Sequence, residues 1–376
     1  MKAIVNGKII IRDDIIENKM LLFNEKITAI QDAVEGIRDV EVIDAKGCYV
    51  SPGFIDIHVH GSFGCDVMDL DEGAIDTISK GLCQYGVTGF LPTTMSLHKE
   101  NIQRALRNIR RAAGIKASGA KVLGAHLEGP FINVLRKGAH GKENIIKADF
   151  ELIKDYLDII KIITIAPEIE GNMDFIKDMH QHSHITFSIG HSNATYEEAM
   201  NAIKVGVKSA THMFNAMSGL NHREPGVAAA VLNSDIYCEF IADKIHAHPA
   251  MFKLLANVKG SDKIILITDA IRAACMKSGE YDLGGQQVTV EHGAARLSDG
   301  TLAGSVLRLN RAVKNLWENT ELSLQQVIST VTMNPAKLIG LDSEIGSLEI
   351  GKKADIVIFD KNIDIKTTII DGEFYK

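Results

Sequence analysis

The chain has 376 residues, 45% of them hydrophobic, which is enough for a large buried core. Its 41 lysines and arginines against 48 aspartates and glutamates give a net charge of −7, which argues against a nucleic-acid-binding surface. No stretch approaches about 18 uninterrupted apolar residues and no signal-peptide pattern opens the chain, so we expect no membrane insertion. Five cysteines without C-x-x-C spacing are typical of free thiols in the cytoplasm.

The order of predicted elements changes character at residue 51. Before it, short strands are expected at 3–5, 9–11, 20–23, 27–30 and 40–43. After it, strands are expected at 53–60, 87–93, 121–128, 160–166, 185–191, 209–213, 236–242 and 264–269. Helical patterns separate these strands, and two further helices are expected at 308–319 and 324–332. Eight strands alternating with helices predict a parallel (β/α)8 barrel of the TIM type.

Two segments fall outside this alternation. A glycine-rich stretch at 281–303, after the eighth strand, predicts a β-hairpin insertion in the position of a lid. The C-terminal tail returns to strands at 354–359 and 367–370. Strands at both chain ends predict a small β-sandwich domain made from residues 1–50 and 344–376, attached to a barrel domain of residues 51–343.

The strand at Phe54–Gly61 carries the clearest chemical signal. Side chains alternate along a strand, so Asp56, His58 and His60 share one face, while the apolar residues between them need covering by an outer layer. Two imidazoles on one face can bind one metal ion. A His-x-His pair alone is weak support for a metal site, so the positions of the other histidines and carboxylates matter.

Those other residues fall at the C-terminal ends of predicted strands. Glu128 ends the third strand, His191 ends the fifth, His212 lies in the sixth and Asp269 ends the eighth. In a parallel barrel these ends form one rim, where active sites are built. Imidazole and carboxylate suit zinc or a similar divalent ion, which lowers the pKa of bound water towards about 7. We expect Glu128 to bridge two ions and Asp269 to act as general base and then acid.

Two stretches resemble the metal-dependent amidohydrolase superfamily, namely PGFIDIHVHG at 52–61 and GSLEIGKKAD at 346–355. Within it, five motifs in order are similar to the deacetylases of N-acetylated amino-sugar 6-phosphates: HLEGPF at 126–131, GHS at 190–192, THMFNAM at 211–217, REPG at 223–226 and TDA at 268–270. The similarity spans essentially the whole chain. It implies metal-dependent hydrolysis of the acetamide of N-acetylglucosamine 6-phosphate to glucosamine 6-phosphate and acetate.

The resemblance also assigns roles to individual positions. The implied metal ligands are His58, His60, Glu128, His191, His212 and Asp269. The implied catalytic residues are Asp269, as acid–base, and His140, which polarises the acetyl carbonyl. The implied sugar and phosphate contacts are Ala139, His140, Asn215, Ala216, Arg223 and His246, with Leu302 near the acetyl group.

Cofactor and assembly follow from the same resemblance. Some members replace the His-x-His pair by Gln-x-Asn and use one ion, whereas this chain keeps both His58 and His60, which favours two ions and leaves one as the alternative. Zinc is expected first, with iron, manganese or cobalt as alternatives. A homodimer with a shared phosphate site is expected, with the subunit that supplies Arg223 and His246 left open. Cys65 departs from the family pattern. It is expected to be a metal ligand, an oxidation target or a residue that only fills space.

Several alternatives stay open at this stage. The substrate can be the N-acetylgalactosamine epimer. A cyclic-amide hydrolase of the dihydroorotase kind commonly uses a carbamylated lysine where this chain has Glu128. A catalytically dead barrel that only binds would have lost ligand positions, and here all are filled. His126 is either a support for the metal ligands or a core residue, and the group of histidines at 180–184 is expected to be a solvated helix end.

Overall fold

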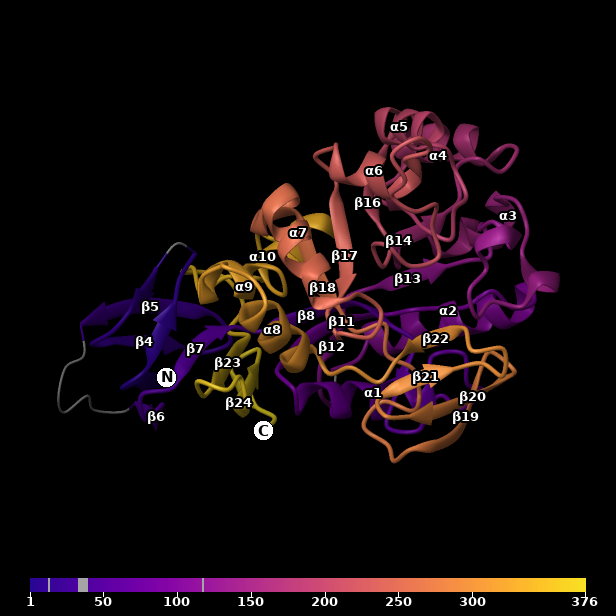
Figure 1. Cartoon of the computed structure of the whole chain (residues 1–376). Coiled ribbons are helices and arrows are strands. Elements are labelled where there is room, and N and C mark those ends of the chain that lie inside the picture. Colours follow the sequence, from indigo (N-terminus) through magenta and orange to yellow (C-terminus); the bar gives the residue numbers. More distant parts are fainter. Residues whose placement is uncertain (13, 33–39, 117) are drawn as a thin grey trace.

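The computed structural model describes residues 1–12, 14–32, 40–116 and 118–376. Two sheets of parallel strands occupy its centre (Figure 1). One runs β12 (Lys121–Val122), β11 (Val87–Pro92), β8 (Phe54–Val59). The other runs β13 (Ala125–Glu128), β14 (Ile160–Ile165), β15 (Thr186–Ile189), β16 (Val207–Ala210), β17 (Tyr237–Ile241), β18 (Ile264–Ile267). Isolated parallel bridges join the sheets at both sides, from Val59 to Ala270 and from Thr93 to His126.

Helices separate the strands as the sequence predicts. They are α1 (Ala74–Cys83), α2 (Lys99–Ala113), α3 (Phe150–Ile153), α4 (Asn172–His182), α5 (Tyr196–Val205), α6 (Gly226–Leu232), α7 (Pro249–Lys259), α8 (Leu309–Glu318), α9 (Leu324–Ser329) and α10 (Met333–Leu338). The α5 helix begins with a capping box between Thr195 and Glu198. The sequence did not predict α10, which contains Pro335 near its start. No helix in the described ranges has the length and apolarity to span a membrane.

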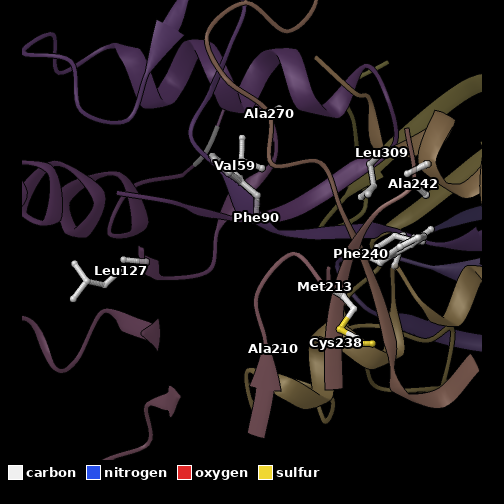
Figure 2. Close-up of a cluster of buried hydrophobic side chains, with 14 of the residues drawn as sticks. Val59, Phe90, Leu127, Ala210, Met213, Cys238, Phe240, Ala242, Ala270 and Leu309 are labelled. Atoms are coloured by element: carbon white, nitrogen blue, oxygen red, sulfur yellow. The ribbon is translucent and has the colours of Figure 1, made fainter. Parts of the chain in front are cut away.

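The central strands are buried on both faces, which explains their nearly continuous apolar runs. Ile55 and Ile57 pack in a cluster with Ala336 and Leu338 of α10, so the outward face of β8 is covered by a helix. The largest apolar cluster, part of which Figure 2 shows, draws residues from β8, β11, β13, β16, β17 and α8. This packing leaves His58 on the opposite side of β8 from α10.

Strands from both chain ends lie together in one lobe (Figure 1). One sheet has the order β5 (Ile27–Asp32), β4 (Lys19–Phe23), β1 (Lys2–Val5), β6 (Glu41–Asp44). The second has the order β25 (Glu373–Phe374), β24 (Ile365–Ile370), β23 (Ile356–Phe359), β7 (Tyr49–Pro52), β2 (Lys8–Ile10), β3 (Ile15–Ile16). The antiparallel pairing of β7 with β23 joins the two ends of the chain.

The insertion after β18 is larger than the single hairpin that the sequence predicts. It is an antiparallel sheet of β19 (Gly279–Leu283), β20 (Gln286–Glu291), β21 (Ala294–Arg296) and β22 (Leu302–Ser305). Two tight turns, at Gly284–Gly285 and His292–Gly293, close its first hairpins, and all four residues have positive φ. Its last strand returns to the rim, where the Ser305 amide donates to the Asp269 carbonyl oxygen at 2.7 Å.

Candidate active site

The backbone turns sharply where the central strands end. His191, His212 and Asp269 follow β15, β16 and β18 with φ of 47°, 31° and 50°. Positive φ is uncommon for residues other than glycine and clusters at functional sites. His60 follows β8 directly and Glu128 is the last residue of β13.

The first half of the site joins His58 and His60 to two carboxylates. Their Nε2 atoms lie 3.3 Å apart, and both face Glu128 Oε2, at 3.4 Å from His58 and 3.0 Å from His60. Asp269 Oδ1 lies 3.3 Å from His60 Nε2 and 3.6 Å from His58 Nε2. The structure therefore brings together residues more than 200 positions apart in the chain.

The second half uses the other oxygen of Glu128. Oε1 lies 3.1 Å from His191 Nε2 and 2.9 Å from His212 Nε2, and these two nitrogens are 3.0 Å apart. One carboxylate thus faces an imidazole pair on each side, the arrangement expected of a bridging ligand.

The donor atoms fit a divalent metal ion. Bond lengths of about 2.0–2.1 Å in a tetrahedral zinc site place neighbouring ligand atoms about 3.3–3.4 Å apart, close to the separations observed. His191 Nδ1 donates to the Arg136 carbonyl oxygen at 2.8 Å, and His212 Nδ1 donates to that of Asn215 at 3.2 Å. Because a carbonyl oxygen only accepts, the proton sits on Nδ1 and the Nε2 lone pair faces the site.

The electrostatics of the cluster also favour a cation. Burial opposes protonation of His60, yet hydrogen bonds to Asp269 and Glu128 raise its pKa to about 9. Burial likewise opposes protonation of His58, but the charges of Glu128, Asp269 and Glu239 raise its pKa well above the usual value. Buried carboxylates that attract protons onto neighbouring imidazoles will also attract a metal ion.

His140 differs from the other imidazoles in its hydrogen bonds. The amide of Ser96 donates to its Nδ1 at 3.1 Å, so Nδ1 carries no proton in this geometry and Nε2 does. Burial lowers the pKa of His140 to about 4, which keeps the ring neutral. Its Nε2–H lies 3.6 Å from Glu128 Oε2, inside the cavity. The hydrogen bond to Nδ1 favours a donor at His140 Nε2, and Glu128, His140 and His191 are also close enough together to share an ion.

A cavity of about 310 Å³ opens above the cluster. The predicted substrate contacts that line it are Ala139, His140, Asn215, Ala216, His246 and Leu302. Arg223 does not line it: this exposed side chain borders a neighbouring hollow, which it shares with Asn193 and Arg136. Arg136 lines both hollows, and its Nε donates to Asn193 Oδ1 at 2.9 Å.

The remaining candidates lie outside the ligand set. His126 Nδ1 donates to the Ile57 carbonyl oxygen at 2.9 Å and its Nε2 accepts from Thr164 Oγ1 at 2.8 Å, so the ring is a buried support beside His58. Cys65, on β10 (Cys65–Asp66), belongs to none of the possible metal-binding groups in the described ranges. The same holds for the histidines at 180–184, and His182 ends α4 exposed to solvent.

Sequence reasoning missed two carboxylates, the buried Glu239 and the half-buried Glu168. Glu239, in the middle of β17, accepts from His58 Nδ1 at 2.9 Å. Glu168 accepts from Ser192 Oγ at 2.7 Å and from the Asn193 amide at 2.6 Å, which fixes the loop after His191. Glu168 follows β14, so it could have been predicted because functional residues lie at the C-terminal ends of parallel strands. The only signal for Glu239 was an acidic residue within the apolar run YCEFI.

The fold and this cluster define a class of protein. The chain belongs to the amidohydrolase family, whose profile matches residues 49–374. It is 42% identical to the N-acetylglucosamine-6-phosphate deacetylase of Bacillus subtilis, over 85% of this chain and 83% of the relative. It is 35% identical to the N-acetylgalactosamine-6-phosphate deacetylase of Escherichia coli O157:H7, over 91% of each chain.

Solved structures of N-acetylglucosamine-6-phosphate deacetylases are also similar to this chain. The crystal structure of N-acetylglucosamine-6-phosphate deacetylase from Pasteurella multocida matches with a TM-score of 0.94 and 33% identity, covering 99% of both chains. A mutant of the enzyme from Mycobacterium smegmatis, in complex with N-acetyl-D-glucosamine-6-phosphate, matches with a TM-score of 0.91 and 25% identity, covering 100% of this chain and 99% of the other.

Proposed function

We propose that this protein hydrolyses the acetamide of N-acetylglucosamine 6-phosphate, releasing acetate and glucosamine 6-phosphate. The observation that carries the proposal is Glu128, whose two oxygens each face a pair of imidazoles at the floor of a cavity. The relatives support this choice of substrate, since most of the relatives that are similar over most of the chain are named N-acetylglucosamine-6-phosphate deacetylase. The galactosamine epimer is the second candidate because one relative is named for it.

The proposed metal ligands are His58, His60, Glu128, His191, His212 and Asp269. A bound divalent cation would lower the pKa of water towards about 7 and so supply a nucleophile at neutral pH. We propose two ions per subunit because Glu128 presents one oxygen to each imidazole pair. Nitrogen and oxygen donors favour zinc, with iron, manganese and cobalt as alternatives and one ion as the alternative stoichiometry.

Two residues carry the proton and charge movements of the proposed reaction. Burial opposes ionisation of Asp269, but His58 and His60 hold its pKa below the usual value, so it can accept a proton from the attacking water. It then returns this proton to the nitrogen of the departing amine as the amide C–N bond breaks. His140 donates its Nε2–H to the acetyl oxygen as negative charge develops there.

The proposed substrate contacts line the rest of the cavity. His246 is oriented by Asp243, whose Oδ2 accepts from His246 Nδ1 at 2.7 Å. Leu302, on β22, offers an apolar side chain for the acetyl methyl group. Arg223 lies outside this chain's cavity, so we propose a homodimer in which the partner subunit's Arg223 completes the phosphate site. Five free cysteines support a cytoplasmic location.

The proposed architecture is a closed (β/α)8 barrel over residues 51–343 and a small β-sandwich of residues 1–50 and 344–376. Support for closure comes from the two isolated bridges that join the parallel sheets. Support for the sandwich comes from one apolar cluster that contains Leu21 of one terminal sheet and Ile358 of the other.

The test is acetate release. Purified protein is incubated with N-acetylglucosamine 6-phosphate, with N-acetylgalactosamine 6-phosphate, or with either sugar after treatment with a chelator. We expect acetate from the glucosamine substrate, loss of turnover after chelation and recovery on adding zinc. Faster turnover of the epimer would reassign the substrate. No acetate from either sugar with zinc, iron, manganese or cobalt would overturn the proposed reaction and leave the cyclic-amide hydrolase and the binding protein as the alternatives.

A further inference from the structure

We propose that Glu239 is a positioning residue on which ion binding at the His58/His60 half of the cluster depends. This inference rests on the proposed metal-dependent function and deepens it. Glu239 is the middle residue of β17, its side chain is fully buried, and it does not line the substrate cavity. It therefore acts through His58.

The contacts of one carboxylate oxygen set the orientation of His58. Glu239 Oε2 accepts from His58 Nδ1 at 2.9 Å and from the main-chain amide of His212 at 3.3 Å. A carboxylate only accepts, so the His58 proton is held on Nδ1 and the Nε2 lone pair is left for a ligand bond. Because His212 belongs to the other half of the cluster, the same oxygen also connects the two halves.

The second oxygen of Glu239 indicates why a carboxylate is there at all. Oε1 is buried without a hydrogen-bond partner, and His126 Nδ1, 3.9 Å away, already donates to the Ile57 carbonyl oxygen. Across the described residues, no lysine or arginine pairs with Glu239. A buried carboxylate with so little compensation is destabilising unless positive charge lies close by. A cation held at His58 Nε2, across the ring, would supply that charge.

The two halves of the cluster differ in their outer support. In the second half, His191 and His212 each donate Nδ1–H to a main-chain carbonyl oxygen, which no side-chain substitution removes. In the first half, His60 Nδ1 is buried without a hydrogen-bond partner, so among the described residues Glu239 makes the one outer side-chain hydrogen bond to the imidazole pair, while the His126 ring only packs against His58. Loss of the Glu239 charge should therefore weaken ion binding at the His58/His60 half and leave ion binding at the His191/His212 half unchanged.

The experiment compares zinc binding by metal-free wild-type protein, Glu239→Gln and Asp355→Asn, using calorimetric titration and metal analysis after dialysis. Asp355→Asn is the matched control, because it makes the same acid-to-amide change at a buried carboxylate that pairs with Lys121 away from the site. We expect two zinc ions in wild type and control. In Glu239→Gln we expect one ion to bind with unchanged affinity and the second ion to bind about 10- to 100-fold more weakly.

The outcomes separate the two proposals. Wild-type protein that binds no divalent ion would overturn the proposed metal-dependent function. Two ions of unchanged affinity in Glu239→Gln, or a single ion in wild type that the substitution leaves unaffected, would overturn only the role of Glu239. If circular dichroism shows that the metal-free variant is unfolded, ¹⁵N-histidine NMR of zinc-loaded wild type decides instead. A protonated, hydrogen-bonded His58 Nδ1 is expected, and an unprotonated Nδ1 would contradict the inference.

Discussion

The carboxylate of Asp269 lies beside the imidazole of His60, with Oδ1 3.3 Å from Nε2, at the edge of the cavity floor. This position would let one group contact both the proposed metal ligands and a substrate in the cavity. We predict that Asp269→Asn lowers kcat by about 10²- to 10⁴-fold, because the amide cannot take up the proton of the attacking water. Acetate release and metal analysis test this together; near-normal turnover would remove Asp269 from the acid–base role.

His140 is predicted to be catalytic without being a metal ligand. Its Nδ1 is occupied by the Ser96 amide, and its Nε2–H is directed into the cavity. His140→Ala should lower kcat by about 10²- to 10³-fold, because a donor to the developing oxyanion is lost. The metal content should stay at the wild-type value. A variant that loses an ion would instead make His140 a ligand, together with Glu128 and His191, which are close enough to share an ion with it.

Gly304, in the last strand of the insertion, lies close to Asp269, the proposed acid–base residue. A Cβ at this position would lie 2.5 Å from Ile271 Cγ2 and 3.0 Å from the Asp269 carbonyl oxygen, on a backbone with φ of +59°. We predict that Gly304→Ala lowers kcat and reduces the free energy of unfolding by about 1–3 kcal/mol. Gly300→Ala is the control, since it has positive φ and no atom within 4 Å of the added Cβ. Equal effects of both substitutions on kcat would assign the loss to backbone strain alone.

Metal removal should affect stability as well as turnover. Five buried imidazoles face Glu128 or Asp269 at 2.9–3.6 Å, namely those of His58, His60, His140, His191 and His212. The metal-free site therefore holds polar groups arranged for a cation. We expect chelation to lower Tm, and zinc at about 100 times its Kd to stabilise the fold by about 2.7 kcal/mol for each site. Differential scanning calorimetry with and without chelator measures the change, and an unchanged Tm would argue against resident metal.

Cys65 is predicted to be dispensable. The thiol is half-buried on β10 and belongs to none of the possible metal-binding groups in the described part of the chain. Cys65→Ser should leave the metal content and kcat within about twofold of wild type, because the change removes no proposed ligand and nearly keeps the size of a side chain that is only partly buried against the core. A loss of one ion in the serine variant would make the thiol a ligand after all.

The sequence alone predicted which residues meet at the proposed metal site. A strand has a side-chain period of two, so His58 and His60 had to share a face once β8 was recognised. Parallel strands present their C-terminal ends together, so Glu128, His191 and Asp269 were expected at one rim. These inferences use only local periodicity and chain order, both of which are visible in a sequence.

Tertiary structure decided what depends on distances between remote segments. Glu239 is 181 positions from His58, and as one acidic residue in an apolar strand it gave no sign of which imidazole it would contact. The tautomer of His140 follows from the Ser96 amide, 44 positions away, and the exclusion of Arg223 from the cavity follows from the path of its loop. Such contacts depend on how helices, strands and loops pack against one another. The type of a residue does not show which remote residues it will contact.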